Sequence, residues 1–205
     1  MVDSSYQLVQ TNYSQKNPVI RLLLKNFVNK LYELLSELGA KQELGLDAGC
    51  GEGHLIGRLH ARRVIGKIAA VDASNDHLSY AIKTYPCCEY TAADLSHLPF
   101  PANTFDYILS TEVFEHLMDP RRAMKELRRV GKKGAHLIIS IPFEPFFHWG
   151  NLVRGKYWYR GGYTPDHRNL WHRQEFGKFL APFVTIDRDF SYQTFPWLLF
   201  RCRFR

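Results

Sequence analysis

Leu46-Asp47-Ala48-Gly49-Cys50-Gly51-Glu52-Gly53 is the stretch that decides the fold of this 205-residue chain. It begins with an apolar run that ends in a carboxylate, three glycines follow at alternate positions, and apolar residues at helical spacing come next. This order predicts a strand, a tight turn and a helix. Glycines suit such a turn because they adopt left-handed conformations and let a ligand approach without meeting a Cβ atom. The stretch predicts a site for a nucleotide-type cofactor, provided that the spacing around it agrees.

The residues that follow have the spacing of a nucleotide-binding unit. Ile68 to Val71 is a second apolar run, and Asp72 comes directly after it. In such units a carboxylate at a strand end, roughly 20 residues after the glycines, meets the ribose hydroxyls. Asp72 and Ala73 are therefore the expected ribose contacts.

An ordered set of motifs resembles those of the class I S-adenosylmethionine-dependent methyltransferases, over about residues 43–141. They are Leu46 to Gly53, Asp72, Ala93-Asp94-Leu95, Phe105 to Ile108 and Glu112 to Leu117. The form Gly-x-Gly-x-Gly differs from the Gly-x-Gly-x-x-Gly of NAD-binding domains. The resemblance implies an α/β, Rossmann-like fold: a seven-stranded, mostly parallel sheet with a terminal antiparallel hairpin, helices on both faces, and an aromatic-rich insertion after the fifth strand.

The resemblance also implies S-adenosyl-L-methionine as the cofactor and indicates its contacts. Asp47 would lie near the methionine portion, where a carboxylate offsets ammonium and sulfonium charge. Asp94 would meet the adenine amino group, and the backbone N–H of Leu95 would meet the ring. As isolated residues, Asp47 and Asp94 could equally serve turns. The full set of expected cofactor contacts is Asp47, Gly49, Cys50, Gly51, Gly53, Asp72, Ala73, Asp94, Leu95 and Ser110.

A second group of chemically active residues follows the fourth expected strand. Glu112, Glu115 and His116 stand at i, i+3 and i+4, so a helical turn would bring them onto one face. The pattern is similar to one in quinone-ring O-methyltransferases and terminal 2′-O RNA methyltransferases, where it holds a divalent metal. His167 resembles a further ligand of the RNA enzymes. His116, His167 and Glu115 are the candidate catalytic residues, and a metal is compatible with the sequence but not required by it.

Each of these candidates has a purely structural alternative. Glu115 and His116 could simply begin a helix and hold its backbone amides. His167 could be a hydrogen-bonded structural histidine. The sequence leaves these alternatives open, and with them the identity of any metal.

Composition limits the class of protein. The chain is 45% hydrophobic and 23% charged, which is typical of a globular protein, and we expect one domain over residues 1–205. A formal charge of +7 leaves nucleic acid open as a partner. The cysteines fit neither a zinc site nor a disulfide framework. With no signal pattern at the N-terminus and no apolar run of membrane-spanning length, we expect a cytoplasmic protein without a membrane span.

Apolar periodicity and turn residues predict the elements. A core helix is expected from Pro18 to a stop at Gly39, preceded by a frayed tail or a cofactor lid at residues 1–17. The aromatic and basic stretch 142–171 is expected to form the acceptor-side insertion, and Gly131 to Gly134 a turn. The other expected helices are 53–61, one that Ser74 caps, 120–130 and 172–181; the strands are about 43–47, 68–71, 87–91, 105–110, 135–141, 183–189 and 192–203.

These observations favour a methyltransferase that acts on a small-molecule acceptor at oxygen, with His116 or His167 managing the acceptor's proton. The basic charge and the Glu-x-x-Glu-His pattern keep a terminal 2′-O RNA methyltransferase as an alternative. A non-catalytic cofactor-binding regulatory protein is the alternative of another class. An NAD-dependent oxidoreductase would leave Asp94 and the glycine pattern unexplained. The acceptor and the oligomeric state are not readable from the sequence.

Overall fold

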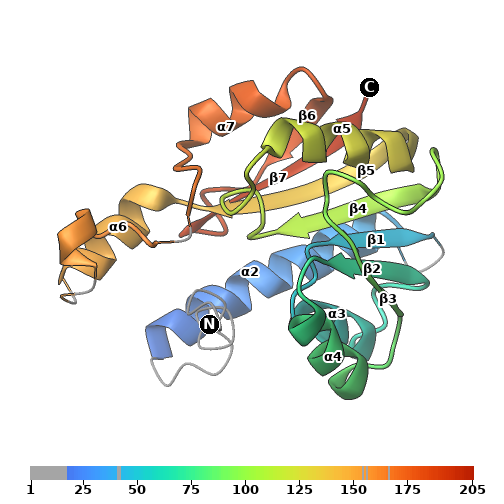
Figure 1. The fold of residues 1–205 in the computed structure, drawn as a ribbon, viewed down its shortest axis with the longest axis horizontal. Helices are drawn as coiled ribbons and strands as arrows, with labels where there is room; N and C mark the ends of the chain where they lie inside the picture. The colour runs from blue at the N-terminus through green and yellow to red at the C-terminus, as the bar shows by residue number, and fades with distance from the viewer. Residues whose placement is uncertain (1–17, 41–42, 154, 156, 166) are drawn as a thin grey trace.

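A seven-stranded sheet in the order β3-β2-β1-β4-β5-β7-β6 forms the centre of the molecule (Figure 1). The structure is a computed structural model that describes residues 18–205, apart from 41–42, 154, 156 and 166. The lid considered for residues 1–17 lies outside the described residues. The strands are β1 (Gly45–Ala48), β2 (Ile68–Asp72), β3 (Glu89–Ala92), β4 (Phe105–Thr111), β5 (Gly131–Pro142), β6 (Val184–Asp189) and β7 (Trp197–Phe204).

The strand directions confirm the expected fold class. β3, β2, β1, β4 and β5 pair in parallel, whereas β7 runs antiparallel to both β5 and β6. Parallel neighbours need crossover connections, and helices supply them here. The helical elements are α2 (Pro18–Glu37), α3 (His54–Ala61), α4 (Asn75–Thr84), α5 (Pro120–Val130), α6 (Glu144–Val153), the 3-10 turn η1 (Trp158–Arg160) and α7 (Arg173–Leu180).

Helices cover both faces of the sheet, because side chains that alternate along each strand point to opposite sides. On β5, Leu137 and Ile139 pack with α5 and α7, whereas Ile138 packs with α2 and α3. Figure 1 shows α5 and α7 on one side of the sheet and α2, α3 and α4 on the other. Within the described residues, none of these helices combines the length and the apolar character that a membrane crossing needs.

Local capping explains where two of the helices begin. The Ser74 side chain accepts a hydrogen bond from the backbone N–H of His77 and starts α4. The Asp119 side chain accepts one from the N–H of Arg122, and Pro120 stands in the first turn of α5. Both starts agree with the sequence prediction, and α4 is thereby fixed directly behind Asp72.

Two element boundaries differ from the prediction. The expected turn from Gly131 to Gly134 is instead the start of β5, because Gly131 pairs with Phe105 and a register shift on β4 admits the extra residues. The last strand begins at Trp197 rather than Tyr192. Turns that start at the carbonyl of Phe190 occupy the intervening residues.

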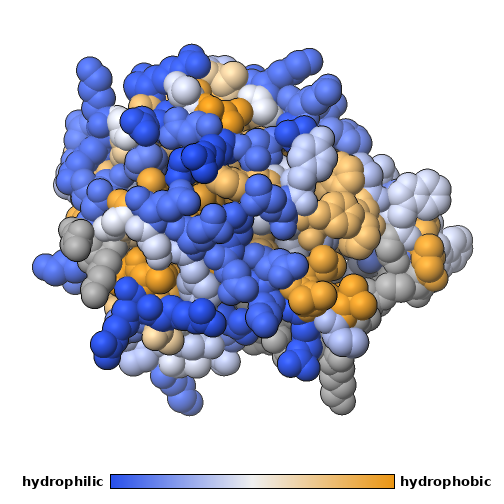
Figure 2. All heavy atoms as spheres, turned by 180° about the vertical axis from the view of Figure 1, so that it is seen from behind, coloured by the Kyte–Doolittle hydropathy of each residue, from blue (hydrophilic) through white to orange (hydrophobic). Residues whose placement is uncertain are grey.

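The segment between β5 and α7 carries exposed apolar side chains. Phe146, Trp149 and Val153 of α6 are exposed, as are Trp158 and Tyr159 of η1. Figure 2 shows a largely hydrophilic face on which a group of apolar side chains gathers toward the end that carries α6. The aromatic insertion thus forms a surface of its own beside the sheet.

Candidate active site

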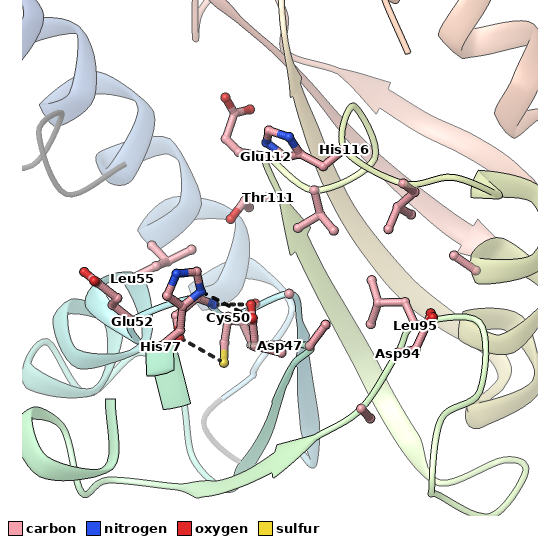
Figure 3. Close-up of a pocket in the computed structure, with 18 of the residues that line it drawn as sticks. Asp47, Cys50, Glu52, Leu55, His77, Asp94, Leu95, Thr111, Glu112 and His116 are labelled. Carbon is pink, nitrogen blue, oxygen red and sulfur yellow. Dashed lines mark hydrogen bonds and ion pairs between the residues drawn. The ribbon is translucent and has the colours of Figure 1, made fainter. Parts of the chain in front are cut away.

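A cavity of about 460 Å³ lies at the carboxyl ends of the parallel strands (Figure 3). Its walls come from the loops after β1, β2, β3 and β4, from Leu24 and Phe27 of α2, and from Trp197 of β7. Ligands of open α/β sheets bind at this edge, and the volume is within the usual range for small-molecule sites.

Most of the expected cofactor contacts line this cavity: Asp47, Gly49, Cys50, Gly51, Asp72, Ala73, Asp94 and Leu95. Gly53 and Ser110 are not among its lining residues. A Cβ at Gly53 would lie 3.1 Å from the Cβ of Ala81 in α4 and 3.0 Å from the hydroxyl of Tyr90 in β3, so a glycine here allows close packing against both elements. The buried Ser110 hydroxyl donates to the carbonyl of Ala48 at 3.0 Å, and Thr111 lines the cavity in its place.

Glycine is required at the first two glycine positions of the loop for different physical reasons. Gly49 has φ +89°, and a Cβ there would lie 2.4 Å from a methyl carbon of Val113. Its N–H and that of Cys50 both donate to the carbonyl of Val71, which ties the loop to β2. Gly51 has φ +52°, and a Cβ there would meet no protein atom within 4 Å. Because Gly51 lines the cavity, a ligand could approach its backbone closely.

Asp72 ties the glycine loop to the start of α4. Its Oδ2 accepts the N–H of Gly51 at 2.8 Å, and its Oδ1 accepts the N–H of Ser74 at 2.9 Å. His77 Nδ1 lies 3.4 Å from Oδ1, and hydrogen bonding to Asp72 raises the pKa of His77. Each carboxylate oxygen can accept more than one hydrogen bond, so ligand hydroxyls could still bind here. The sequence prediction of a ribose contact missed this loop-anchoring role.

Asp47 and Asp94 lie in contrasting surroundings. The side chain of Asp47 is only 2% exposed, and burial, followed by the charge of Asp72, raises its pKa to about 7. A cationic ligand group beside it would lower that pKa again, so this part of the cavity favours a positive charge. Asp94 is exposed, and hydrogen bonds from Ser96, the backbone N–H at 2.7 Å among them, lower its pKa. It therefore forms a turn and also lines the cavity.

The residues after β4 do not form the expected helical turn. Glu112 has φ +58°, and its N–H donates to the carbonyl of Ser140, so it continues the pairing with β5. Its Oε1 accepts the Ser140 hydroxyl at 3.3 Å. A non-helical turn over Phe114 to His116 comes next. Glu112, Glu115 and His116 therefore do not share one helical turn.

Glu115, His116 and His167 lie together, as the candidate catalytic set requires. Their potential ligand atoms all lie within 4.8 Å of one another. His116 Nε2 is 3.7 Å from Glu115 Oε1, and the two imidazole rings are 5.0 Å apart, edge to face. Burial, followed by the charge of Glu112, raises the pKa of Glu115 well above its usual value. Of the three, His116 lines the cavity, where Figure 3 shows it beside Glu112.

Sequence reasoning missed Glu144, at the start of α6. Its side chain is buried, and its Oε1 is hydrogen bonded to Nδ1 of His167. The available signal was an acidic residue just beyond the apolar β5, at the carboxyl edge of the sheet where the other site residues lie. Trp197 of β7 was also missed, because an antiparallel strand that returns to this edge leaves no local sequence signal.

The parallel sheet, the glycine loop after β1 and the carboxylates near the ends of β1, β2 and β3 define a Rossmann-like, nucleotide-cofactor-binding protein. A family model described as "Methyltransferase domain" matches residues 46–139. Over this stretch the chain is similar to S-adenosylmethionine-dependent methyltransferases, and its fold is the one such enzymes have.

Two curated relatives illustrate the match. A probable S-adenosylmethionine-dependent methyltransferase of Mycobacterium tuberculosis is 34% identical over 97 residues, which are 47% of this chain and 35% of the relative. A demethylmenaquinone methyltransferase of Bacillus licheniformis is 30% identical over 149 residues, 70% of this chain and 63% of the relative. This chain thus spans about a third to under two thirds of the length of these relatives.

A solved structure supports the fold across almost the whole chain. The S-adenosylmethionine-dependent methyltransferase of Aquifex aeolicus superposes with a TM-score of 0.70, covering 96% of this chain and 98% of its own. At 21% sequence identity, the likeness shows the shared architecture alone.

Proposed function

We propose that this protein transfers the methyl group of S-adenosylmethionine to an oxygen atom of a small-molecule acceptor. One observation carries the proposal: a single cavity runs from Asp47 and Asp72 at the glycine loop to Glu112 and His116 beyond β4. A cofactor at the first end and an acceptor at the second would therefore share one enclosed space. Proximity of this kind supplies much of the rate enhancement in group transfer.

The proposed contacts at the cofactor end are those that the resemblance to methyltransferases implies, and most of these residues line the cavity. Asp72 holds the ribose hydroxyls, Asp94 and the N–H of Leu95 hold the adenine, and Asp47 holds the amino group. When bound, S-adenosylmethionine supplies a methyl group activated by the positive charge on its sulfur. Leu24, Phe27 and other apolar lining residues keep water away from this part of the cavity.

The acceptor end contains the base. His116 lines the cavity and is paired with the buried Glu115, so it can accept the proton of an acceptor hydroxyl. An imidazolium at His116 would in turn lower the raised pKa of Glu115, 3.7 Å away, and so favour its carboxylate as the counter-charge. We take residues 1–205 as one methyltransferase unit in which the segment 142–171 supplies the acceptor side, since Glu144 and His167 belong to it. The Bacillus licheniformis relative is named for a small-molecule acceptor, which favours the same class here.

A labelled-methyl transfer assay tests this proposal. We expect label from S-adenosylmethionine to reach members of a panel of small phenols and other hydroxylated aromatics, and not RNA oligonucleotides with a free 3′ end. Because a general base contributes about 10²-fold or more, His116→Ala should reduce transfer by that factor while S-adenosylhomocysteine binds as before. His60→Ala, an exposed histidine of α3, is the matched control.

The other outcomes of the assay favour the alternatives. Transfer to RNA alone would replace the small-molecule acceptor by the RNA alternative, which the exposed Arg121, Lys125 and Arg128 of α5 suit. Tight cofactor binding with no transfer to any acceptor offered would favour the regulatory alternative.

A further inference from the structure

We propose that Glu112 selects an acceptor that carries a protonated amine in addition to the hydroxyl that is methylated. Glu112 lines the cavity beside His116, at the end far from Asp94 (Figure 3). His116 would accept the proton of the hydroxyl, while the carboxylate of Glu112 would bind the amine. This substrate class rests on the proposed function, because it concerns the acceptor end of the same cavity.

The charges around the cavity are mostly negative, although the whole chain has a formal charge of +7. Among the described residues that line it, Arg122 is the one arginine or lysine. Six lining residues carry a carboxyl group: Asp47, Glu52, Asp72, Asp94, Glu112 and Asp119. A cleft of one sign of charge attracts ligands of the opposite sign, so this cavity favours cationic molecules over anionic ones.

Five of these six carboxyl groups already have a role. Three are the proposed cofactor contacts, Glu52 pairs with His54 at 3.1 Å, and Asp119 caps α5. The remaining one is Glu112, on the acceptor side. Its charge is therefore the one that an acceptor is free to use.

The two hydrogen-bond donors to the Glu112 carboxylate are neutral. The Ser140 hydroxyl donates to Oε1 at 3.3 Å, and the side chain of Trp197 also hydrogen bonds to the carboxylate. Burial raises the pKa of Glu112 to about 8 in spite of these two donors. A cation beside the carboxylate would lower that pKa again. A protonated amine supplies both the positive charge and further N–H donors.

Two further carboxyl groups near Glu112 disfavour an anionic acceptor. The charge of Glu144 contributes to the raised pKa of Glu112, and the charge of Glu112 contributes to the raised pKa of Glu115. Glu115 is 1% exposed, and neither of its carboxyl oxygens has a hydrogen-bond partner among the described residues. An acceptor with its own carboxylate would add like charge to this group, whereas a cation would offset it.

Aromatic rings beside Glu112 favour the same ligand. Phe27 of α2 and Trp197 of β7 both line the cavity, with their ring centroids 5.2 Å apart. Aromatic faces attract cations, tryptophan most strongly, and the attraction grows when the cation is desolvated. Because Trp197 also hydrogen bonds to Glu112, an amine at the carboxylate would lie close to its indole ring.

The test compares three phenols of similar shape that differ in charge: tyramine, para-ethylphenol and para-hydroxyphenylpropionate. Each is titrated calorimetrically into full-length protein saturated with S-adenosylhomocysteine. At about pH 8.5 Glu112 is more than half ionised, and an alkylamine is still protonated. We expect tyramine to bind at least about tenfold more tightly than para-ethylphenol, the usual effect of a charge-assisted hydrogen bond. The anionic phenol should bind most weakly.

Three variants locate the preference. Glu112→Gln removes the charge but keeps an oxygen for the Ser140 hydroxyl, and it should abolish the preference for tyramine. Phe27→Leu should weaken tyramine binding about two- to fivefold, without an equal loss for para-ethylphenol. Glu52→Gln is the matched control, since it neutralises another lining carboxylate that pairs with His54, and it should keep the preference. Thermal melting shows whether each variant is folded.

Equal binding of tyramine and para-ethylphenol by folded wild-type protein, or no binding of tyramine, would overturn the amine site. A preference that persists in Glu112→Gln would overturn it as well. Methyl transfer is a separate measurement. If tyramine binds with a preference that depends on Glu112 but receives no methyl group, the amine site stands and the proposed function fails. Transfer to neutral phenols, without any preference for tyramine, would support the proposed function and contradict the amine site.

Discussion

Asp72→Ala is expected to lower the affinity for S-adenosylhomocysteine by at least about 100-fold. The carboxylate would lose charge-assisted hydrogen bonds to the ribose hydroxyls, each of which contributes about 1.5–3 kcal/mol. It would also lose the N–H groups of Gly51 and Ser74, so the glycine loop would no longer be fixed to α4. Titration calorimetry gives the affinity, and thermal melting reports the stability of each variant.

Asp106→Ala is the matched control for this change. Asp106 also accepts a backbone N–H, that of Leu44 at 3.0 Å, and also pairs with a basic side chain, Lys132 at 2.6 Å. It lies outside the lining of the cavity. The control should therefore lose some stability and keep its affinity for S-adenosylhomocysteine. Unchanged affinity in folded Asp72→Ala would remove the ribose assignment.

Gly51→Ala is expected to lower the same affinity by at least about tenfold. At φ +52° an alanine is strained by about 1–2 kcal/mol, and its Cβ would enter the space that a ligand needs to approach the backbone. Gly49 is a poorer choice for this test because its Cβ would collide with Val113 and disturb the loop itself.

Gly134→Ala controls for backbone strain. Gly134 has φ +77°, a Cβ there would also meet nothing within 4 Å, and it lies in β5 away from the cavity lining. Both variants should lose about 1–2 kcal/mol of unfolding free energy in denaturant titrations. Only Gly51→Ala should lose affinity. Equal affinities in the two variants would mean that no ligand approaches Gly51.

Local signals predicted much of the fold. Apolar periodicity located the strands, and capping residues such as Ser74 and Asp119 located helix starts. The resemblance to known methyltransferases supplied the strand arrangement. The start of β5 was missed because two lysines flanked by Gly131 and Gly134 are typical of a turn. In the structure, Gly131 instead pairs with Phe105, the first residue of β4. Such pairing depends on residues far apart in the chain.

The candidate site was predicted only in part, because some of its contacts also join residues that are far apart in the chain. Spacing located Glu115 and His116. The helical turn expected from Glu112 does not form, because the backbone N–H of Glu112 donates to the carbonyl of Ser140 and extends the strand pairing. Ser110 and Thr111 alternate sides of β4, so a one-residue difference decides which of them faces the cavity. Glu144 meets His167 across 23 positions of sequence, a contact that only the folded chain brings about.

The most direct test of the central claim is calorimetric titration of the wild-type protein with S-adenosylhomocysteine, repeated with NAD. We predict one binding site of micromolar affinity for S-adenosylhomocysteine and no measurable heat with NAD. Folded protein that does not bind S-adenosylhomocysteine, or that binds NAD instead, would contradict the assignment of the cavity to S-adenosylmethionine.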